Sequence, residues 1–450
     1  MGMMTTVSKL KQYLEEIKKN DKKGNRINAF IHVRDEKDLI KEAEEIDRKI
    51  KSGKAGRLAG KIIAVKSNIN VKGEIISCAS KTLENYHAPY DATVIEKIKQ
   101  EDGLIIGMAN MDEFACGSSG ETSAFGAIKN PVNTELVPGG SSSGSAASVA
   151  AGFCDMALGS DTGGSIRMPS SCCGIVGIKP TYSSVSRYGL IDLSMSLDQI
   201  GSLARNVSEA ALLLDVIRGK DERDSISEDS EKINLKEIEK TPQNLTIGIL
   251  DFEIGDRRIG KIIKEKTEQF AKKFGFKTKN VLIKNIDLAV ETYYPIVYVE
   301  FFSATRRFDG RRYGEKIEDA GGQEVLRRIL GGSEISREEF SGRYYYKALK
   351  IKNMVEKEFS DIFKNVDCII SATVPKLPHK LGTKISVREM YEYDALTIPS
   401  NLAGNCAISI PAGELDGIPV GLQITCDKFQ EQKMLQIARA FEKLEEMSKI

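Results

Sequence analysis

The sequence has few of the residues that metal and disulfide sites require. Among 450 residues there are three histidines, His32, His87 and His379, which lie far apart and form no His-x-x-x-His pair. A histidine-rich metal site is therefore not expected, and we assign no metal-binding residue. The eight cysteines include no Cys-x-x-Cys pair. This spacing indicates reduced thiols and a cytoplasmic protein.

Excess charge and long apolar runs are also missing. Lys and Arg number 65 against 64 Asp and Glu, a net charge of +1. A chain that holds nucleic acid by itself needs a surplus of clustered positive charge, so any polynucleotide partner should be held mainly by another chain. No stretch approaches the roughly 18 apolar residues of a membrane span, and the N-terminus has amphipathic helical spacing rather than a signal peptide's apolar core.

Apolar segments alternate between strand and helix patterns up to about residue 215, which predicts an α/β fold with a mostly parallel sheet. Residues 219–244 are dense in charge and are expected to form a surface excursion, and residues 257–365 should be mainly helical. A final amphipathic helix is expected over about 428–447. We interpret the chain as one large domain with a helical insertion. The expected strands are 61–66, 103–107, 174–178, 245–250, 368–371, 407–410 and 420–424.

Glycine and serine gather in two segments, 138–145 and 159–167. Such clusters can simply form tight turns, and Ser143 or Ser145 could cap the Ala-rich helix that follows. Phosphate binding is a second interpretation, since Gly139 and Gly144 have the spacing of a P-loop. Ser145 and Ala146 stand where that motif needs lysine and a hydroxyl residue, which argues against nucleotide binding.

Two kinds of serine nucleophile are also compatible with these segments. Ser142 is the centre of a formal Gly-x-Ser-x-Gly elbow, but that mechanism needs a histidine, and His379 is expected in an exposed loop. A serine activated by lysine needs no histidine. Lys66 ends an apolar strand; burial could bring its pKa down from about 10.4 toward neutrality, unless the side chain reaches out to water.

Three motifs, taken together, resemble the amidase signature family. Lys66 in Ala-Val-Lys-Ser-Asn-Ile, Ser141 in Gly-Gly-Ser-Ser, and Ser165 in Gly-Ser-Asp-Thr-Gly-Gly-Ser-Ile-Arg match its Lys, cis-Ser and Ser residues in order, at intervals of 75 and 24 residues. Other stretches are similar to the branch formed by the A subunits of the aspartyl/glutamyl-tRNA amidotransferases. These stretches are 111–126, 185–190, 196–201, 308–314, 399–404 and 417–424.

The resemblance implies a single amidase domain over 1–450, with a large mixed sheet covered by helices and a helical insertion that contributes to the substrate pocket. It also implies glutamine hydrolysis, in which Ser165 attacks the amide, Ser141 relays the proton and Lys66 is the base. A cis peptide bond would precede Ser141. The implied oxyanion hole is made of backbone amides of Thr162, Gly163, Gly164 and Ser165.

By the same resemblance, Arg328 would bind the α-carboxylate of glutamine, Asp394 its α-ammonium, and Tyr293 would line the pocket. No cofactor is expected in this chain. Ammonia would pass to a partner, the B subunit, which holds ATP and Mg²⁺ and amidates mischarged Glu-tRNA(Gln) or Asp-tRNA(Asn), and a small C subunit would wrap the interface. A stand-alone amidase acting on another small amide and a catalytically silent scaffold are the alternatives.

The sequence departs from the family pattern at several positions near these motifs. Ser143 replaces a usual glycine, Met168 stands where glutamine often follows the arginine, and Cys172 and Cys173 replace small or aromatic residues. None of these changes removes a catalytic group. A thiol this close to Ser165 is expected to make the protein sensitive to alkylation.

Overall fold

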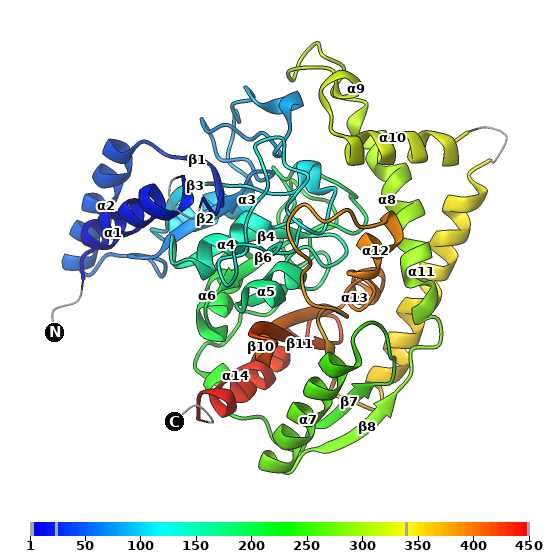
Figure 1. Ribbon diagram of the computed structural model, residues 1–450. Coiled ribbons are helices and arrows are strands. Elements are labelled where there is room, and N and C mark those ends of the chain that lie inside the picture. The colour runs from blue at the N-terminus through cyan, green and yellow to red at the C-terminus, as the bar shows by residue number, and fades with distance from the viewer. Residues whose placement is uncertain (1–3, 23–25, 338–340, 448–450) are drawn as a thin grey trace.

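A single mixed sheet of eleven strands runs through the described chain, which in this computed structural model comprises residues 4–22, 26–337 and 341–447. The strand order is β1-β3-β2-β4-β6-β5-β10-β11-β9-β7-β8. Figure 1 shows β1, β2 and β3 on one side of the molecule and β7 and β8 on the other. The strands are β1 (Phe30–Val33), β2 (Ile62–Lys66), β3 (Leu104–Ala109), β4 (Met156–Asp161), β5 (Val176–Lys179), β6 (Gln199–Ala204), β7 (Thr246–Leu250), β8 (Lys277–Val281), β9 (Cys368–Ala372), β10 (Cys406–Leu415) and β11 (Ile418–Cys426).

The expectation of a mostly parallel sheet is wrong, whereas the large mixed sheet implied by the resemblance is confirmed. Of ten ladders between described strands, four are parallel and six antiparallel. One antiparallel pair has a clear local cause. Asp416 and Gly417 join β10 to β11, with φ of 54° and 75°. An Asp-Gly pair with positive φ at both residues favours a two-residue hairpin.

Helices cover both faces of the sheet. α3, α6, α7 and α14 pack on one face, where Ile63 and Val65 of β2 point, and α2, α4 and α5 lie on the other, where Ile62 and Ala64 point. The helices are α1 (Thr6–Glu16), α2 (Glu36–Lys51), α3 (Thr93–Gln100), α4 (Ser143–Ala150), α5 (Arg167–Cys173), α6 (Val207–Ile217), α7 (Arg257–Phe274), α8 (Ala289–Thr305), α9 (Ile317–Ala320), α10 (Gln323–Ile335), α11 (Arg343–Phe363), α12 (Val387–Glu392), α13 (Ile398–Ala403) and α14 (Glu431–Met447).

The segment 257–365 begins with elements of the sheet layer, because α7 packs against β9 and β8 pairs with β7. The helices that follow form a separate layer, in which α8 packs on α10 and α11 and shares an apolar cluster with α13. These helices lie on the side of the molecule away from α1 and α2 (Figure 1). Among the described residues, no helix is both long and apolar enough to cross a membrane.

All seven strands expected from the sequence are present, and so is the final helix, as α14. The charged excursion 219–244 is less solvated than expected. Its Ile233 and Ile238 are buried in the main core, and Asp224 forms an ion pair with Arg187. The segment is therefore attached to the sheet layer by buried contacts at several points, although its described helical structure is a single short turn, Glu237–Glu239.

Candidate active site

Lys66 is the last residue of β2, and its side chain is fully buried. By strand alternation it points to the same face as Ile62 and Ala64, toward α4. Its Nζ donates hydrogen bonds to Ser141 Oγ at 2.8 Å, Ser160 Oγ at 2.9 Å and Ser160 O at 3.2 Å. Burial lowers the pKa of Lys66 to about 7, against the opposing effect of nearby carboxylates. The alternative in which this lysine reaches water is wrong.

Ser141 lies in the turn before α4, and the Gly140–Ser141 peptide bond is cis. Gly140 packs directly on a carboxylate: a Cβ at this position would lie 2.0 Å from Asp112 Oδ2. The backbone carbonyl of Ser141 accepts a hydrogen bond from Asp112 N at 3.3 Å. Ser141 is fully buried, so its hydroxyl faces Lys66 without competition from solvent.

Ser165 lies in the turn between β4 and α5 and is 8% exposed, whereas Lys66 and Ser141 are fully buried. Its carbonyl accepts a hydrogen bond from Ser142 N at 3.0 Å, which joins the two serine turns. Within the described chain Ser165 Oγ has no hydrogen-bond partner, Ser141 included. Catalytic hydrogen bonds are often long in ligand-free enzymes and tighten when substrate binds.

The amides around Ser165 are not equivalent. Gly164 N donates to Asp161 Oδ1 at 2.9 Å and Ile166 N to Asp161 Oδ2 at 3.1 Å. In the described residues, no hydrogen bond engages the backbone amides of Thr162, Gly163 or Ser165. Of the four amides expected to form the oxyanion hole, the Gly164 N–H is already committed to the Asp161 carboxylate, which leaves three for the proposal below.

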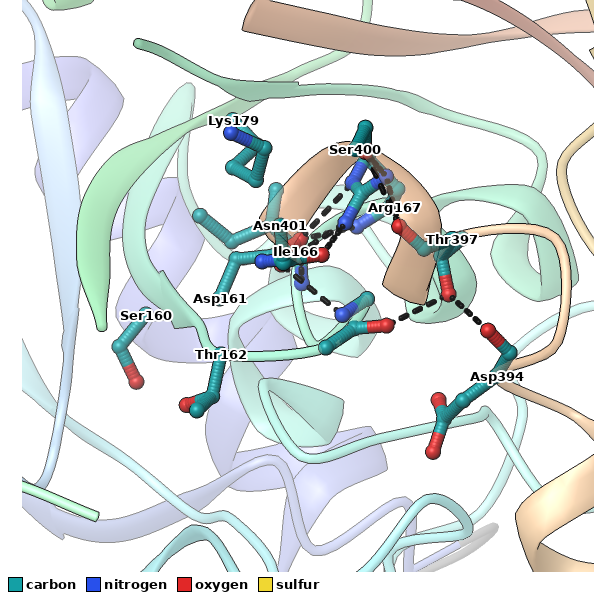
Figure 2. A network of polar contacts seen from close by, with 12 residues as sticks. Ser160, Asp161, Thr162, Ile166, Arg167, Lys179, Asp394, Thr397, Ser400 and Asn401 are labelled. Carbon is teal, nitrogen blue, oxygen red and sulfur yellow. Dashed lines mark hydrogen bonds and ion pairs between the residues drawn. The ribbon is translucent and has the colours of Figure 1, made fainter. Parts of the chain in front are cut away.

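A buried ion pair between Arg167 and Asp161 supports the turn (Figure 2). Arg167 contacts Asp161 through Nε at 3.1 Å and Nη2 at 3.0 Å, and both side chains are 0% exposed. Although burial raises it, the Arg167 guanidinium and neighbouring donors bring the pKa of Asp161 down to about 2. The remaining Arg167 donors are satisfied by C-terminal residues, which fits the rule that buried charges persist only when fully hydrogen-bonded. The acceptors are Thr397 O, Ser400 Oγ, Asn401 Oδ1 and Gln423 Oε1.

The three residues expected to bind glutamine gather beside this turn. A Cβ on Gly163 would lie 2.7 Å from the Tyr293 ring, so Tyr293 covers the turn directly. Arg328 is 3% exposed, and its side chain makes one hydrogen bond within the described chain, from Nε to Glu324 Oε1 at 2.8 Å. Asp394 accepts one side-chain hydrogen bond, from Tyr294 OH at 3.4 Å. Burial raises the pKa of Asp394 to about 8, opposed by Arg328.

In this arrangement two buried ionisable groups, Arg328 and Asp394, can each still bind a group of opposite charge. Among the described residues, Arg328 keeps its terminal Nη donors free for a carboxylate, and Asp394 forms no ion pair, so the charge of Arg328 only partly offsets the effect of burial on its pKa. A ligand that carries both a carboxylate and an ammonium would satisfy both. Within the described part of the chain, no group of three or more His, Cys, Asp or Glu side chains could hold a metal ion.

The other interpretations of the glycine and serine segments are not supported. His379 bonds Glu121 and Tyr393 rather than Ser142. The segment is a loop as expected, but the expected solvated histidine is wrong, because its side chain is only 12% exposed. Ser142 instead donates to Ser160 O at 3.1 Å. The amides of Ser142 and Gly144 bond Ser165 O and Asn110 O, which leaves neither for a phosphate.

Some of the positions that depart from the family pattern have a visible structural role, and others have none. Neither Ser143 nor Ser145 caps α4: Ser145 Oγ donates to Leu158 O at 2.9 Å, and Ser143 Oγ is buried without a partner among the described residues. Met168 and Cys172 pack together in a small apolar cluster. Cys172 is 1% exposed and burial raises the pKa of its thiol to about 12, so the expected sensitivity to alkylation is not supported.

Sequence reasoning missed several residues that shape the site: Ser160, Asp161, Arg167, Asp198 and Thr397. Asp198 accepts a hydrogen bond from Thr162 Oγ1 at 2.6 Å, and burial raises the pKa of its carboxyl to about 7. Arg167 offered a signal, because it lies among apolar and small residues in a segment with little other charge. Asp198 lies in 196–201, one of the stretches similar to the family, but its contact with Thr162 joins residues distant in sequence. Thr397 offered no signal, since its partner Gly163 is also distant in sequence.

Comparison with known proteins places this geometry in a family. A family model described as Amidase matches residues 10–435. The chain belongs to the amidase family. One relative, the A subunit of the glutamyl-tRNA(Gln) amidotransferase of Methanocaldococcus jannaschii, is 54% identical over 439 residues, covering 97% of this chain and 99% of the relative.

Solved amidase-family structures share the fold. The crystal structure of the A subunit of the glutamyl-tRNA(Gln) amidotransferase from Thermotoga maritima has a TM-score of 0.83 and 37% identity, covering 97% of this chain and 91% of the other. A peptide amidase in complex with the competitive inhibitor chymostatin has a TM-score of 0.84 and 25% identity, covering 98% and 94%. The fold of this amidase is therefore similar both to that of an amidotransferase subunit and to that of a peptide amidase.

Proposed function

We propose that this chain is the glutamine-hydrolysing A subunit of a tRNA-dependent amidotransferase. The observation that carries the chemistry is the buried hydrogen bond from Lys66 Nζ to Ser141 Oγ at 2.8 Å, with the pKa of the lysine lowered to about 7. A lysine with this pKa is partly neutral at physiological pH and can accept a proton. Relatives about half identical over nearly the full chain support the choice of substrate.

In the proposed acylation step, Ser165 Oγ attacks the side-chain amide carbon of glutamine. The serine proton passes through Ser141 Oγ to neutral Lys66 Nζ. The amides of Thr162, Gly163 and Ser165 stabilise the tetrahedral oxyanion, and one such donor typically contributes about 2.7–4 kcal/mol to barrier lowering. The carbon–nitrogen bond then breaks, and the proton returns from Lys66 through Ser141 to the departing nitrogen. The products of this step are ammonia and a γ-glutamyl ester of Ser165.

Deacylation uses the same groups in the same order. Water attacks the ester carbonyl while its proton passes through Ser141 to Lys66, and the oxyanion forms again at the same amides. Breakdown of the intermediate breaks the bond to Ser165 Oγ, which regains its proton by the reverse path. Glutamate is released and the free enzyme is restored.

Recognition of glutamine rests on its two charged α-substituents. Arg328 binds the α-carboxylate through its Nη donors, Asp394 binds the α-ammonium, and Tyr293 closes the pocket against the nucleophile turn. The ammonium then stabilises the ionised form of Asp394, whose pKa is about 8 in the empty site. Helices α8 and α10, which carry Tyr293 and Arg328, thereby contribute to the substrate pocket.

The ammonia is used by partner subunits. In this proposal, the B subunit holds ATP and Mg²⁺ and the mischarged tRNA, the small C subunit wraps the interface, and this chain works in the cytoplasm without a cofactor of its own. The names of the relatives favour Glu-tRNA(Gln) as the acceptor, with Asp-tRNA(Asn) as a second acceptor to be assayed. The near-neutral charge of this chain agrees with a division of labour in which the B subunit grips the tRNA.

The decisive experiment measures glutamate release and tRNA amidation by the complex purified from the native cell, with both mischarged tRNAs as acceptors. Wild type should release glutamate and amidate tRNA, and Ser165→Ala should abolish both with glutamine but retain amidation with added ammonium chloride. Equal hydrolysis of glutamine by the isolated chain, without stimulation by partners or aminoacyl-tRNA, would favour a stand-alone amidase. Amidation that persists with glutamine in Ser165→Ala would indicate a silent scaffold.

A further inference from the structure

The peptide group between Gly163 and Gly164 is held at both of its polar ends. Its carbonyl, Gly163 O, accepts a hydrogen bond from Thr397 Oγ1 at 2.6 Å. Its amide, Gly164 N, donates to Asp161 Oδ1 at 2.9 Å. The peptide therefore cannot rotate about its flanking bonds without breaking one of two buried hydrogen bonds. The free amides of Gly163 and Ser165 lie on either side of it.

Thr397 is also in close steric contact with this peptide. Gly164 has a φ of +144°, and a Cβ built on it would lie 2.2 Å from Thr397 Oγ1. The absence of a side chain at Gly164 therefore lets the threonine hydroxyl approach the backbone. Figure 2 shows Thr397 between Asp394 and the turn that carries Asp161 and Thr162.

The hydroxyl proton of Thr397 has two acceptors within reach, Gly163 O at 2.6 Å and Asp394 O at 3.1 Å. Asp394 O already accepts two backbone hydrogen bonds, from Thr397 N at 3.0 Å and Ile398 N at 2.9 Å. Both lone pairs of that carbonyl are thus in use. The proton therefore goes to Gly163 O, at the shorter distance, and the Asp394 turn is held by the backbone without the hydroxyl.

We propose that Thr397 is a positioning residue, whose hydroxyl fixes the Gly163–Gly164 peptide so that the neighbouring free amides point at the developing oxyanion. This inference rests on the proposed glutaminase function and adds a residue to it. Because Asp394 and Thr397 belong to one turn, a short stretch of backbone joins the group that binds the substrate ammonium to the group that sets the oxyanion amides. Substrate recognition and charge stabilisation therefore share a rigid support.

The test compares Thr397→Val, which keeps the branched shape and removes the hydroxyl, with Thr397→Ser, which restores the hydroxyl. Thr267→Val is the matched control, since Thr267 is equally buried and its hydroxyl also bonds a backbone carbonyl, Ile263 O at 2.7 Å, on α7. In Thr397→Val, kcat for glutamine should fall about 10- to 100-fold, which is less than the full effect of removing an oxyanion donor. KM for glutamine should change less than about threefold. Thr397→Ser and Thr267→Val should stay within about threefold of wild type.

A binding measurement separates positioning from a loss of structure. A glutamine analogue with a boronic acid in place of the carboxamide forms a tetrahedral adduct with a serine, whereas glutamate, the product, does not. Thr397→Val should weaken boronate binding about as much as it lowers kcat and leave glutamate binding unchanged, because only the tetrahedral species needs the oxyanion amides. If the valine variant does not fold, Thr397→Ala provides the same comparison.

Unchanged kcat and boronate affinity in Thr397→Val would overturn the inference. So would equal losses of boronate and glutamate binding, which indicate collapse of the substrate pocket, or a Thr397→Ser variant as impaired as the valine variant. A wild-type protein that neither hydrolyses glutamine nor binds the boronate would instead refute the proposed function itself.

Discussion

The protonation state of Lys66 should control the rate of glutamine hydrolysis. In the proposed mechanism, only the neutral amine accepts the proton of Ser165 through Ser141, so activity should rise as the pH increases through the pKa of about 7. From that pKa, the neutral form makes up about one tenth of Lys66 at pH 6 and about nine tenths at pH 8. At the ordinary lysine pKa of 10.5, only about one molecule in 3,000 would be neutral at pH 7. Burial thus raises the concentration of active base about a thousandfold.

The assay is glutamate release by the native complex from about pH 5.5 to about pH 8.5, a range that spans the titration of Lys66. With saturating glutamine, kcat should increase about tenfold between pH 6 and pH 8 and follow Lys66 alone, because the bound ammonium keeps Asp394 ionised. At low glutamine, kcat/KM should depend on pH more steeply, since Asp394, with a pKa of about 8 in the empty site, must also lose its proton.

Substitutions at Lys66 test the same reasoning at constant pH. Lys66→Arg keeps the positive charge but cannot lose it, so activity should fall by about 10⁴-fold or more. Lys443→Arg, at a partly exposed lysine on α14 that donates to Glu239 O, is the matched control and should behave as wild type. A kcat that is flat between about pH 6 and pH 8, or an arginine variant with more than about 1% of wild-type activity, would refute the role of Lys66 as base.

Four further outcomes follow from the site. Arg328→Lys should raise KM for glutamine about 10- to 100-fold with kcat within about threefold, because the carboxylate loses a two-pronged partner. Asp394→Asn should abolish glutamine binding yet raise Tm by about 2–5 °C at pH 8 and less at pH 5. The pKa of Asp394 is raised in the folded protein, so ionisation of this carboxyl lowers the stability of the wild type increasingly from about pH 4 to about pH 8. Gly164→Ala should lose about 100-fold or more in kcat, since its Cβ would lie 2.2 Å from Thr397 Oγ1. Iodoacetamide should leave the native activity intact and label Cys172 only after denaturation, which mass spectrometry can follow.

The sequence indicated the buried lysine for a physical reason. In a strand buried on both faces, successive residues are apolar rather than alternating, and Ile62 to Val65 form such a run. A lysine at the next position therefore starts within the core. The family resemblance then predicted that Ser141 and Ser165 lie near this lysine, and the hydrogen bond between Lys66 and Ser141 agrees with that prediction for Ser141.

The rest of the site could not be deduced in the same way. Arg167 bonds Asn401 and Gln423, which are 234 and 256 positions further along the chain, and no local pattern encodes such partners. The direction of the strands was misjudged because alternation of strands and helices does not reveal which strands become neighbours. β4, for example, pairs antiparallel with β6 although β5 lies between them in sequence.

The strand order has a consequence for when the protein becomes active during its synthesis. β1 to β6 form one side of the sheet and β7 to β11 the other, and the two sides meet where β5 pairs with β10. Arg167, two residues after Ser165, has its last partner in the sequence at Gln423 on β11. Domains fold largely in the order of synthesis. The turn around Ser165 is nevertheless supported only after almost the entire chain has left the ribosome. Incomplete chains should not produce ammonia, so hydrolysis begins only once the whole chain is available to its partners.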